Sequence, residues 1–351
     1  MKKTILLSSF VAIAAMLLNT LPCNATVWRV NNNPNYIQGC SHCFSTLQAA
    51  NDTSIVMAGD TVHLEASVIP YSATTIDKQI TILGPGYFLN QNPGFQKNVY
   101  SASVLRIIFS TGSDSSLISG IYVGQSGNSS SIQINNANYI YIDRTQTRDD
   151  ITFAAGSINT FIIVTKSFIG GRIITGGNNS SVYDINVSNS YIHENISLTS
   201  SSTSNYGTIT QCVLNNFVNI NNGFNFFNNI IVNSTNFSQN NNTTANIYTN
   251  LFVPTVPAFL TGGTNVNEPL LSTVFPSTGS QDSILNVNPI GICPQCYIAF
   301  PGNETFGMFG GADPYNLSGI PNIPSIYQLQ SPLNIIQGAP INVNISTRSN
   351  D

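Results

Sequence analysis

FIIVTKSFIGG at residues 161–171 is the first of five apolar segments that decide the fold. The others are YDINVSNSYIHE (183–194), GTITQCVLNN (207–216), FNFFNNIIVN (224–233) and NIYTNLFVP (246–254), and polar stretches of Asn, Ser and Gly separate them. Aligned on Ser167, Ser190, Cys212, Asn229 and Asn250, the segments recur every roughly 17 to 23 residues, the range of one β-solenoid coil. The repeat therefore predicts an all-β chain folded as a parallel β-helix.

The alternation inside these segments is typical of strands with one buried face. In YDINV (183–187), apolar and polar residues alternate, as inward and outward side chains do along a strand. The Asn-rich stretches at 221–223 and 240–242 supply residues that tolerate the positive φ of coil corners, and stacked asparagines can form amide ladders between coils. A β-sandwich is the competing interpretation, but its strand-and-turn units of about 8 to 12 residues are shorter than this repeat.

The N-terminus has the features of an export signal. Lys2 and Lys3 form a basic start, residues 5–18 form an apolar run, and the small residue Ala25 precedes the expected cleavage site. The run is too short to span a bilayer comfortably, and no later stretch reaches the roughly 20 apolar residues of a transmembrane helix. We expect removal of residues 1–25 to leave a protein that is secreted or held in the cell envelope, without a transmembrane helix.

Composition argues against one class of partner. Charged residues make up 7% of the chain, against roughly 25% in ordinary soluble domains, and the formal net charge is −4. The chain has no basic footprint that could neutralise a phosphate backbone, so nucleic acid is not expected as a partner. A surface of amides and hydroxyls suits an exported protein that meets a polysaccharide or a component of the cell envelope.

The residues before the repeat predict a capped solenoid end. VWRV (27–30) and TVHLE (61–65) each fit a strand. Ser45 and Gln48 fit a capping box, in which a hydroxyl and an amide satisfy free backbone N–H groups at the start of a helix. We therefore expect a short helix over residues 45–51.

The same region carries a family resemblance. FSTLQAAND (44–52), AGDTVHLEAS (58–67) and ITILGPGYF (80–88) together resemble the N-terminal cap and first coils of right-handed parallel β-helix proteins of the pectate-lyase-like superfamily. The resemblance implies that the helix plugs the open end of the solenoid, which would otherwise expose core side chains and strand edges.

The C-terminal part also resembles such proteins. GMFGGADPY (307–315), followed by LSGIPNIPSIY (317–327), is similar to the segment that closes these solenoids in secreted proteins of Bacteroidetes-type bacteria. We therefore expect a signal peptide over 1–25, a β-helix domain with its N-terminal cap over 26–326, and a C-terminal tail of short strands over 327–351. The tail either adds strands to the flank of the solenoid or leads into a sorting element.

The cysteines favour disulfides over a metal site. Cys40 with Cys43, and Cys293 with Cys296, form two Cys-x-x-Cys pairs of the kind that can hold zinc. An exported protein favours oxidised thiols, and at roughly 4.8 Å per coil the two pairs would lie nearly 50 Å apart. We expect local disulfides, or pairing after the C-terminal segment folds back, with no metal and no cofactor. Cys212 occupies a repeat position, so we expect a buried thiol in the stack between coils.

One stretch concentrates aromatic and ionisable residues. Tyr139, Tyr141 and Asp143 share a strand face if Ile140 and Ile142 point inward, and more charges follow a few residues later. Such a patch could stack on a sugar ring, although a solvated strand whose charges neutralise one another is the simpler interpretation. The ligand-binding candidates are Tyr139, Tyr141, Asp143, Arg148, Asp149 and Asp150.

The resemblance also implies possible enzyme chemistry. Lyases of this superfamily hold calcium with clustered carboxylates and use an Arg or Lys base, and the hydrolases use several Asp residues on one face. The chain does not match the polygalacturonase motif set of Asn-Thr-Asp, Asp-Asp and Gly-His-Gly, nor the acidic cluster of the lyases, so no catalytic residue is assigned.

Two functions remain open. We expect a non-catalytic β-helix that serves as an envelope scaffold or as a glycan-binding, adhesin-like module. The alternative is a polysaccharide lyase or glycoside hydrolase, which rests on fold analogy alone. The alternative requires Asp143 and residues 148–150 to converge with charges of neighbouring coils in one groove.

Overall fold

The structure is a computed structural model of the chain. It describes residues 25–34, 40–127, 130–177, 179–198, 205–216, 218–220, 223–237, 245–261, 263–275, 282, 306–332, 337–338 and 340–350. Of the predicted signal peptide only Ala25 is among them, and the predicted disulfide candidates Cys293 and Cys296 lie outside them.

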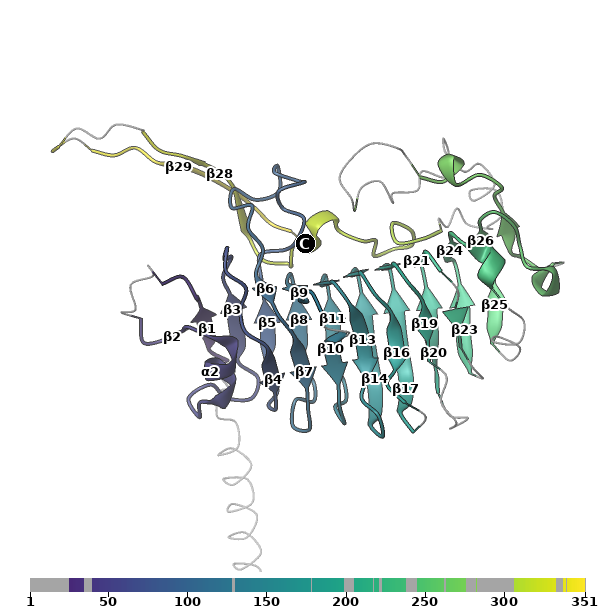
Figure 1. Ribbon diagram of the computed structural model, residues 1–351. Coiled ribbons are helices and arrows are strands. Elements are labelled where there is room, and N and C mark those ends of the chain that lie inside the picture. Colours follow the sequence, from purple (N-terminus) through teal and green to yellow (C-terminus); the bar gives the residue numbers. More distant parts are fainter. Residues whose placement is uncertain are drawn as a thin grey trace, which may run out of the picture.

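The described residues form a parallel β-solenoid of about 8 turns, which confirms the predicted all-β fold. Its coils stack side by side along one axis (Figure 1). Sheet A has 11 strands, sheet B has 9 and sheet C has 7, and in the regular coils the chain passes through A, B and C in turn. Every pairing between neighbouring coils is parallel, for example Ile142 with Val164 and Val164 with Val187.

The strand bounds are as follows. Sheet A contains β2 (Cys43–Phe44), β1 (Val27–Val30), β3 (Thr61–Leu64), β5 (Thr81–Leu83), β8 (Leu117–Ser119), β11 (Tyr141–Asp143), β14 (Ile158–Thr165), β17 (Ser181–Ser188), β20 (Tyr206–Thr210), β23 (Phe224–Phe227) and β25 (Asn246–Tyr248). Sheet B contains β6 (Ser103–Val104), β9 (Tyr122–Val123), β12 (Gln146–Thr147), β15 (Phe168–Ile169), β18 (Tyr191–Ile192), β21 (Val213–Leu214), β24 (Ile230–Ile231), β26 (Leu251–Phe252) and β27 (Val266–Asn267). Sheet C contains β4 (Thr74–Ile76), β7 (Ile107–Phe109), β10 (Ser130–Ile134), β13 (Asp150–Phe153), β16 (Ile173–Thr175), β19 (Ile196–Ser197) and β22 (Val218–Asn219). Short 3₁₀ helices are η1 (Ser234–Asn236), η2 (Ala258–Leu260), η3 (Leu271–Thr273) and η5 (Leu317–Gly319).

A column of fully buried side chains runs along the interior. In sheet A, the paired inward residues include Ile118, Ile142, Val164, Val187 and Ile209, each with no exposed surface. Because neighbouring coils place an apolar side chain at the same level, each residue packs on the ones above and below it. The apolar segments read from the sequence are therefore the walls of one continuous core.

The five residues used to align the repeat are equivalent in space, and Asn265 continues the series by one coil. We define the corner ladder as Ser167, Ser190, Cys212, Asn229, Asn250 and Asn265. They lie buried or half-buried between sheets A and B. Most accept a hydrogen bond from the backbone N–H one coil earlier: Ser167 Oγ from Thr145 at 3.1 Å, Asn229 Oδ1 from Cys212 at 2.9 Å and Asn250 Oδ1 from Asn229 at 3.0 Å. The ladder satisfies backbone groups at a corner where sheet pairing is interrupted.

Cys212 is a buried free thiol within this ladder, as the sequence predicts. Its Sγ donates to the Thr210 carbonyl at 3.2 Å, and burial raises its pKa from 9.0 to about 12. Because the folded pKa lies above the unfolded value, its contribution to stability is complete below pH 9 and is lost as pH rises toward 12.

At pH 8, the native protein should alkylate at Cys212 at least about a hundredfold more slowly than the urea-unfolded chain, because only the thiolate reacts. Iodoacetamide labelling with mass spectrometry of the Cys212 peptide measures both rates. A free peptide of the same sequence controls for intrinsic reactivity. Equal rates in the native and unfolded protein would mean that these coils open freely.

The residue before five of the six ladder positions adopts a left-handed backbone. Lys166, Asn189, Gln211, Asn228 and Thr249 have φ between 46° and 59°, and Arg144, the equivalent of Lys166 one coil earlier, has φ of 41°. Such values favour Gly and Asn, yet Arg, Lys, Gln and Thr occupy four of these positions. The conformation turns the chain from sheet A into sheet B.

The predicted helix is present, but its cap differs. Helix α2 spans Leu47–Asp52, and its N-cap is Thr46, whose side chain accepts from Ala49 N at 3.1 Å. Gln48 does not reach back to Ser45; its amide instead bonds Asp52 and the backbone of Thr75. Leu47 and Ala50 are buried in the main core at the N-terminal end of the solenoid (Figure 1).

The segment expected to close the far end runs back along the solenoid instead. Residues 306–324, which we call the strap, begin at the late coils, where Gly307 N donates to Asn228 O at 2.9 Å. Further along, Lys166 pairs with Asp313, and Tyr87 N donates to Ser318 O at 2.8 Å. At Gly120 the strap approaches so closely that a Cβ would lie 2.3 Å from Pro321 Cγ. The strap therefore crosses most of the coils from late to early (Figure 1).

The strap buries the outer face of sheet B and creates a second core. Each of β15, β18, β21, β24 and β26 has both residues buried. One residue of each pair faces the main core, and the other packs under the strap residues Phe306, Met308 and Tyr315. The contacts explain why these strands are apolar at consecutive positions.

The tail forms a separate antiparallel hairpin. Strand β28 (Ser325–Gln330) pairs with β29 (Asn344–Arg348), and neither strand joins a solenoid sheet. The hairpin projects beside the early coils (Figure 1), and several of its apolar side chains, such as Leu329 and Ile345, are exposed. Within the described residues, no helix is long and apolar enough to cross a membrane.

Candidate functional site

The predicted site residues lie in two separate places. Tyr139, Tyr141 and Asp143 belong to the sheet A side of one coil, whereas Arg148 and Asp149 follow β12 and Asp150 begins β13 in sheet C. Strand β12 of sheet B lies between the two groups. The structure therefore does not bring the six candidates into one groove.

Asp143 lies at the corner that the strap covers. It accepts hydrogen bonds from Ser119 Oγ at 3.0 Å and Arg144 Nη1 at 3.1 Å. Burial raises the pKa of Asp143, while the charge of Arg144 opposes this shift. One coil further, Lys166 pairs with Asp313 of the strap. The Lys166–Asp313 pair therefore ties the strap to the solenoid, while the carboxylate of Asp143 is occupied by Ser119 and Arg144.

The second group forms an ion-pair chain along the next corner. Arg172 donates to both carboxylate oxygens of Asp150, the shorter contact being 2.7 Å, and also approaches Glu194 at 3.5 Å. The hydrogen bond with Asp150 raises the pKa of Arg172. Beside it, Arg148 Nε lies 3.8 Å from Asp149. The contacts of Arg172 link neighbouring coils. They leave the carboxylate of Asp150 paired with a guanidinium instead of facing an open cleft.

Tyr139 and Tyr141 do lie on an outward face, because Ile140 between them and Ile142 after them are fully buried. Tyr139 stacks on Phe161 of the next coil, with ring centroids 4.7 Å apart and planes 7° from parallel. Both residues have left-handed φ, 56° and 54°, so the two backbones bulge outward at the same level. The stacked pair is 45% and 43% exposed, which leaves much of it available to a ligand.

The aromatic surface continues along the solenoid. On the next two coils, Tyr183 and Tyr206 are paired in register with ring centroids 6.1 Å apart. On the last two coils of sheet A, Phe227 and Tyr248 stack at 5.2 Å and 8°. The aromatic ladder is defined as Tyr139, Phe161, Tyr183, Tyr206, Phe227 and Tyr248, one residue on each of six successive coils, which cover roughly 24 Å along the solenoid axis. It consists of three ring pairs that are offset along the strands, since Phe227 pairs in register with Thr210, four residues after Tyr206.

Uncharged polar groups lie between the aromatic pairs. Asn186, Thr208, Asn225 and Asn246 are in register on adjacent strands of sheet A, next to buried inward residues. Asn246 Nδ2 donates to Asn225 Oδ1 at 3.1 Å, so the amides of neighbouring coils are ordered along the axis. Aromatic faces pack against apolar C–H surfaces, and amides bind hydroxyls.

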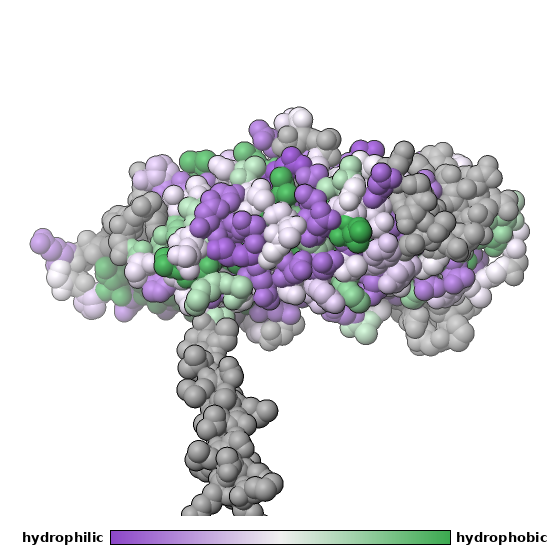
Figure 2. Space-filling view, turned by 90° about the horizontal axis from the view of Figure 1, so that it is seen from below, coloured by the Kyte–Doolittle hydropathy of each residue, from purple (hydrophilic) through white to green (hydrophobic). Residues whose placement is uncertain are grey.

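Five ladder residues were missed by the sequence prediction, which had named Tyr139 and, outside the ladder, Tyr141. Part of the signal was available, since Phe161, Tyr183 and Phe227 each stand beside a buried apolar residue. Figure 2 shows the molecule from below, where hydrophilic residues dominate and hydrophobic residues lie in small groups. On so polar a surface, repeated stacked aromatics are an unusual concentration of apolar area.

Cys40 and Cys43 are joined by a disulfide with an S–S distance of 2.10 Å. Within the described residues, no cluster of three His, Cys, Asp or Glu side chains could hold a metal ion.

Comparisons with family models, curated proteins and solved structures found no match.

Proposed function

We propose that the protein is an exported β-solenoid that binds an extended, uncharged glycan along the outer face of sheet A, without catalysing a reaction. The aromatic ladder carries this proposal. Its three ring pairs lie on successive coils, and ordered amides lie on the same sheet between the levels of the pairs, so one face offers both stacking surfaces and hydrogen-bond partners. The predicted export signal and a surface poor in charge fit a partner met outside the cytoplasm.

The positions of the charged side chains favour binding of a glycan without its cleavage. The carboxylates of Asp143 and Asp150 lie at different corners and are held by Arg144 and Arg172. Glycosidases need two carboxyl groups on opposite sides of one bond. Neither carboxylate is free beside the aromatic ladder.

Replacing Tyr139 and Phe161 together with alanine should weaken binding to the preferred glycan at least about fivefold, because each lost ring contributes roughly 1 kcal/mol. The glycan is chosen from an array probed with the chain lacking residues 1–25, and affinities are measured by isothermal titration calorimetry. Tyr100→Ala, which removes a tyrosine that is 54% exposed outside the ladder, is the matched control.

Two results would count against the proposal. Equal affinity of the double variant and the control would remove the aromatic ladder from the binding site. Release of new reducing ends or unsaturated uronates, with or without calcium, would show catalysis and favour the polysaccharide lyase or hydrolase alternative.

A further inference from the structure

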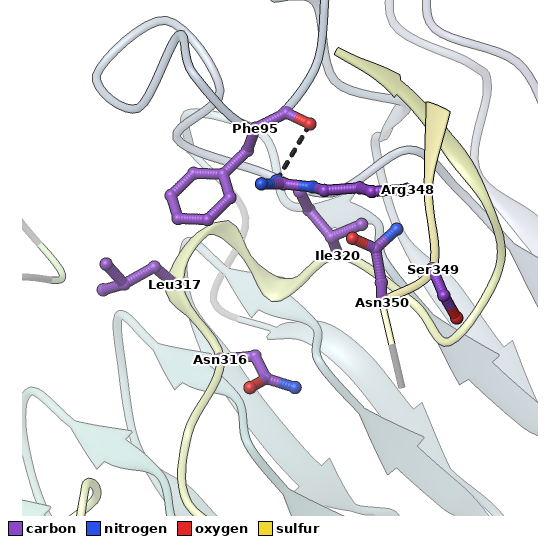
Figure 3. A pocket seen from close by; sticks show the side chains of 7 residues that line it. All are labelled: Phe95, Asn316, Leu317, Ile320, Arg348, Ser349 and Asn350. Atoms are coloured by element: carbon purple, nitrogen blue, oxygen red, sulfur yellow. Dashed lines mark hydrogen bonds between the residues drawn. The ribbon is translucent and has the colours of Figure 1, made fainter. Parts of the chain in front are cut away.

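A small cavity lies where the end of the chain meets the strap, far along the sequence from the aromatic ladder. Its volume is about 220 Å³, and it is lined by Phe95, Asn316, Leu317, Ile320, Arg348, Ser349 and Asn350. In Figure 3 the guanidinium of Arg348 and the amide of Asn316 lie on opposite sides of the cavity, with Phe95 and Leu317 along one flank. The lining therefore combines one cation, two amides and apolar side chains.

Arg348 is held in place but has unused hydrogen-bonding capacity. Its Nη2 donates to the Phe95 carbonyl at 3.0 Å, and its guanidinium carbon lies 4.7 Å from the Phe95 ring centroid and 6.0 Å from that of Tyr327. Among the described residues it forms no ion pair, and its Nε is buried without an acceptor. A fixed guanidinium with free N–H groups is suited to a planar carboxylate.

The amide of Asn316 is also uncommitted. Asn316 is the N-cap residue of η5, but its side chain makes no capping hydrogen bond. On another side of the cavity, Asn350 Nδ2 donates to the Ile323 carbonyl at 2.7 Å, which leaves its Oδ1 as an acceptor. The cavity thus offers amide groups for a hydroxyl in addition to the cation.

The charges of the residues that line the cavity limit which ligands fit it. The seven lining residues include one cation and no carboxylate, so an ammonium group would find no anionic partner there. Leu317, Ile320 and Phe95 require an apolar body rather than a compact inorganic anion. We propose that this cavity binds a small hydroxy carboxylate with an aliphatic body, its carboxylate on Arg348 and its hydroxyl on the Asn316 or Asn350 amide.

Titration of the purified protein with 2-hydroxyisocaproate tests this site. Calorimetry or ligand-observed NMR should detect binding, and the corresponding amide, 2-hydroxyisocaproamide, should bind at least about tenfold more weakly because it lacks the charge. Inorganic phosphate, which has charge but no apolar body, should not compete. Absence of binding up to about 10 mM hydroxy acid, or equal binding of acid and amide, would overturn the proposal.

Two single-residue variants test whether the hydroxy acid binds in this cavity. Arg348→Gln should weaken binding of the acid at least about tenfold, whereas Lys97→Gln, which removes the same charge two residues from Phe95, should leave it unchanged. Since Arg348 also contacts loop residue Phe95, its loss could loosen the hairpin. Asn316→Leu is therefore the second variant: it keeps Arg348 and removes no capping bond, so it should weaken binding several-fold at an unchanged melting temperature. Unchanged affinity in both variants would place any binding elsewhere. These measurements do not depend on whether sheet A binds a glycan.

Discussion

Replacing Asn250 with leucine should lower the free energy of unfolding by about 4 kcal/mol. The Asn250 side chain is fully buried in the corner ladder, where its Oδ1 accepts from Asn229 N at 3.0 Å. Its Nδ2 donates to the carbonyls of Phe226 at 3.0 Å and Tyr248 at 2.8 Å. Leucine has a similar size but satisfies none of these groups, so a buried N–H would lose its acceptor. Urea unfolding followed by circular dichroism measures the change.

Asn246→Leu is the matched control for this experiment. Asn246 is exposed on the outer face of sheet A and bonds Asn225 there, so its loss should change stability by no more than about 0.5 kcal/mol. If both variants lost the same stability, the cost would come from removing an asparagine in general. The corner ladder would then have no special role.

Tyr315→Ala should destabilise the protein by about 4 kcal/mol, because it leaves a cavity in the core beneath the strap. Tyr315 is 3% exposed, and its hydroxyl lies 2.8 Å from that of Tyr87 in the early coils. Burial raises the pKa of both phenols well above 10.0, so the pair stays neutral over the working range of pH. Thermal unfolding measures the loss, and limited proteolysis should cut the strap first.

Tyr315→Phe separates the two contributions of this residue. It keeps the ring and removes the hydroxyl, so the expected loss is only about 1 to 2 kcal/mol. A loss as large as that of the alanine variant would show that the hydrogen bond, rather than the packed ring, holds the strap. A negligible loss in both variants would contradict the second core.

Features that depend on local or repeated sequence patterns, the coils and the capping helix, were predicted from the sequence. Alignment on Ser167, Ser190, Cys212, Asn229 and Asn250 identified residues that are equivalent in space, because stacked coils impose the same environment at each turn. The helix near residue 47 was predicted for a similar reason, since capping is a local property. Its cap moved by one residue because Ser45 and Thr46 are chemically alike and only the backbone chooses between them.

The strap could not be predicted from local patterns, because its contacts join residues that are far apart in sequence. Tyr87 and Tyr315 are separated by 228 positions. An indirect signal existed in doublets such as Tyr191-Ile192 and Ile230-Ile231, since a strand with consecutive apolar residues must be covered on both faces. Such doublets indicate that another segment covers the outer face of the strand, but they do not identify that segment.

The candidate site was predicted only in part, again because contacts between residues far apart in sequence leave no local pattern. Tyr139 and Tyr141 were selected because charges cluster beside them, whereas the structure shows that those charges belong to corners. The pairing of aromatic residues across coils, such as Tyr183 with Tyr206, became visible only once the register was known. Arg348 was not singled out, since a single arginine in a short tail has no pattern that marks it.

The strap has a consequence for how the chain folds. In a simple solenoid, each coil contacts only its neighbours, so coils can form and fray one at a time from either end. Here the strap contacts both late coils, at Asn228, and early coils, at Tyr87. Its binding surface exists only after the coils between them have formed, so docking of the strap should be the last step of folding. Once docked, it opposes fraying of the last coil, and the stack should unfold as a single cooperative unit.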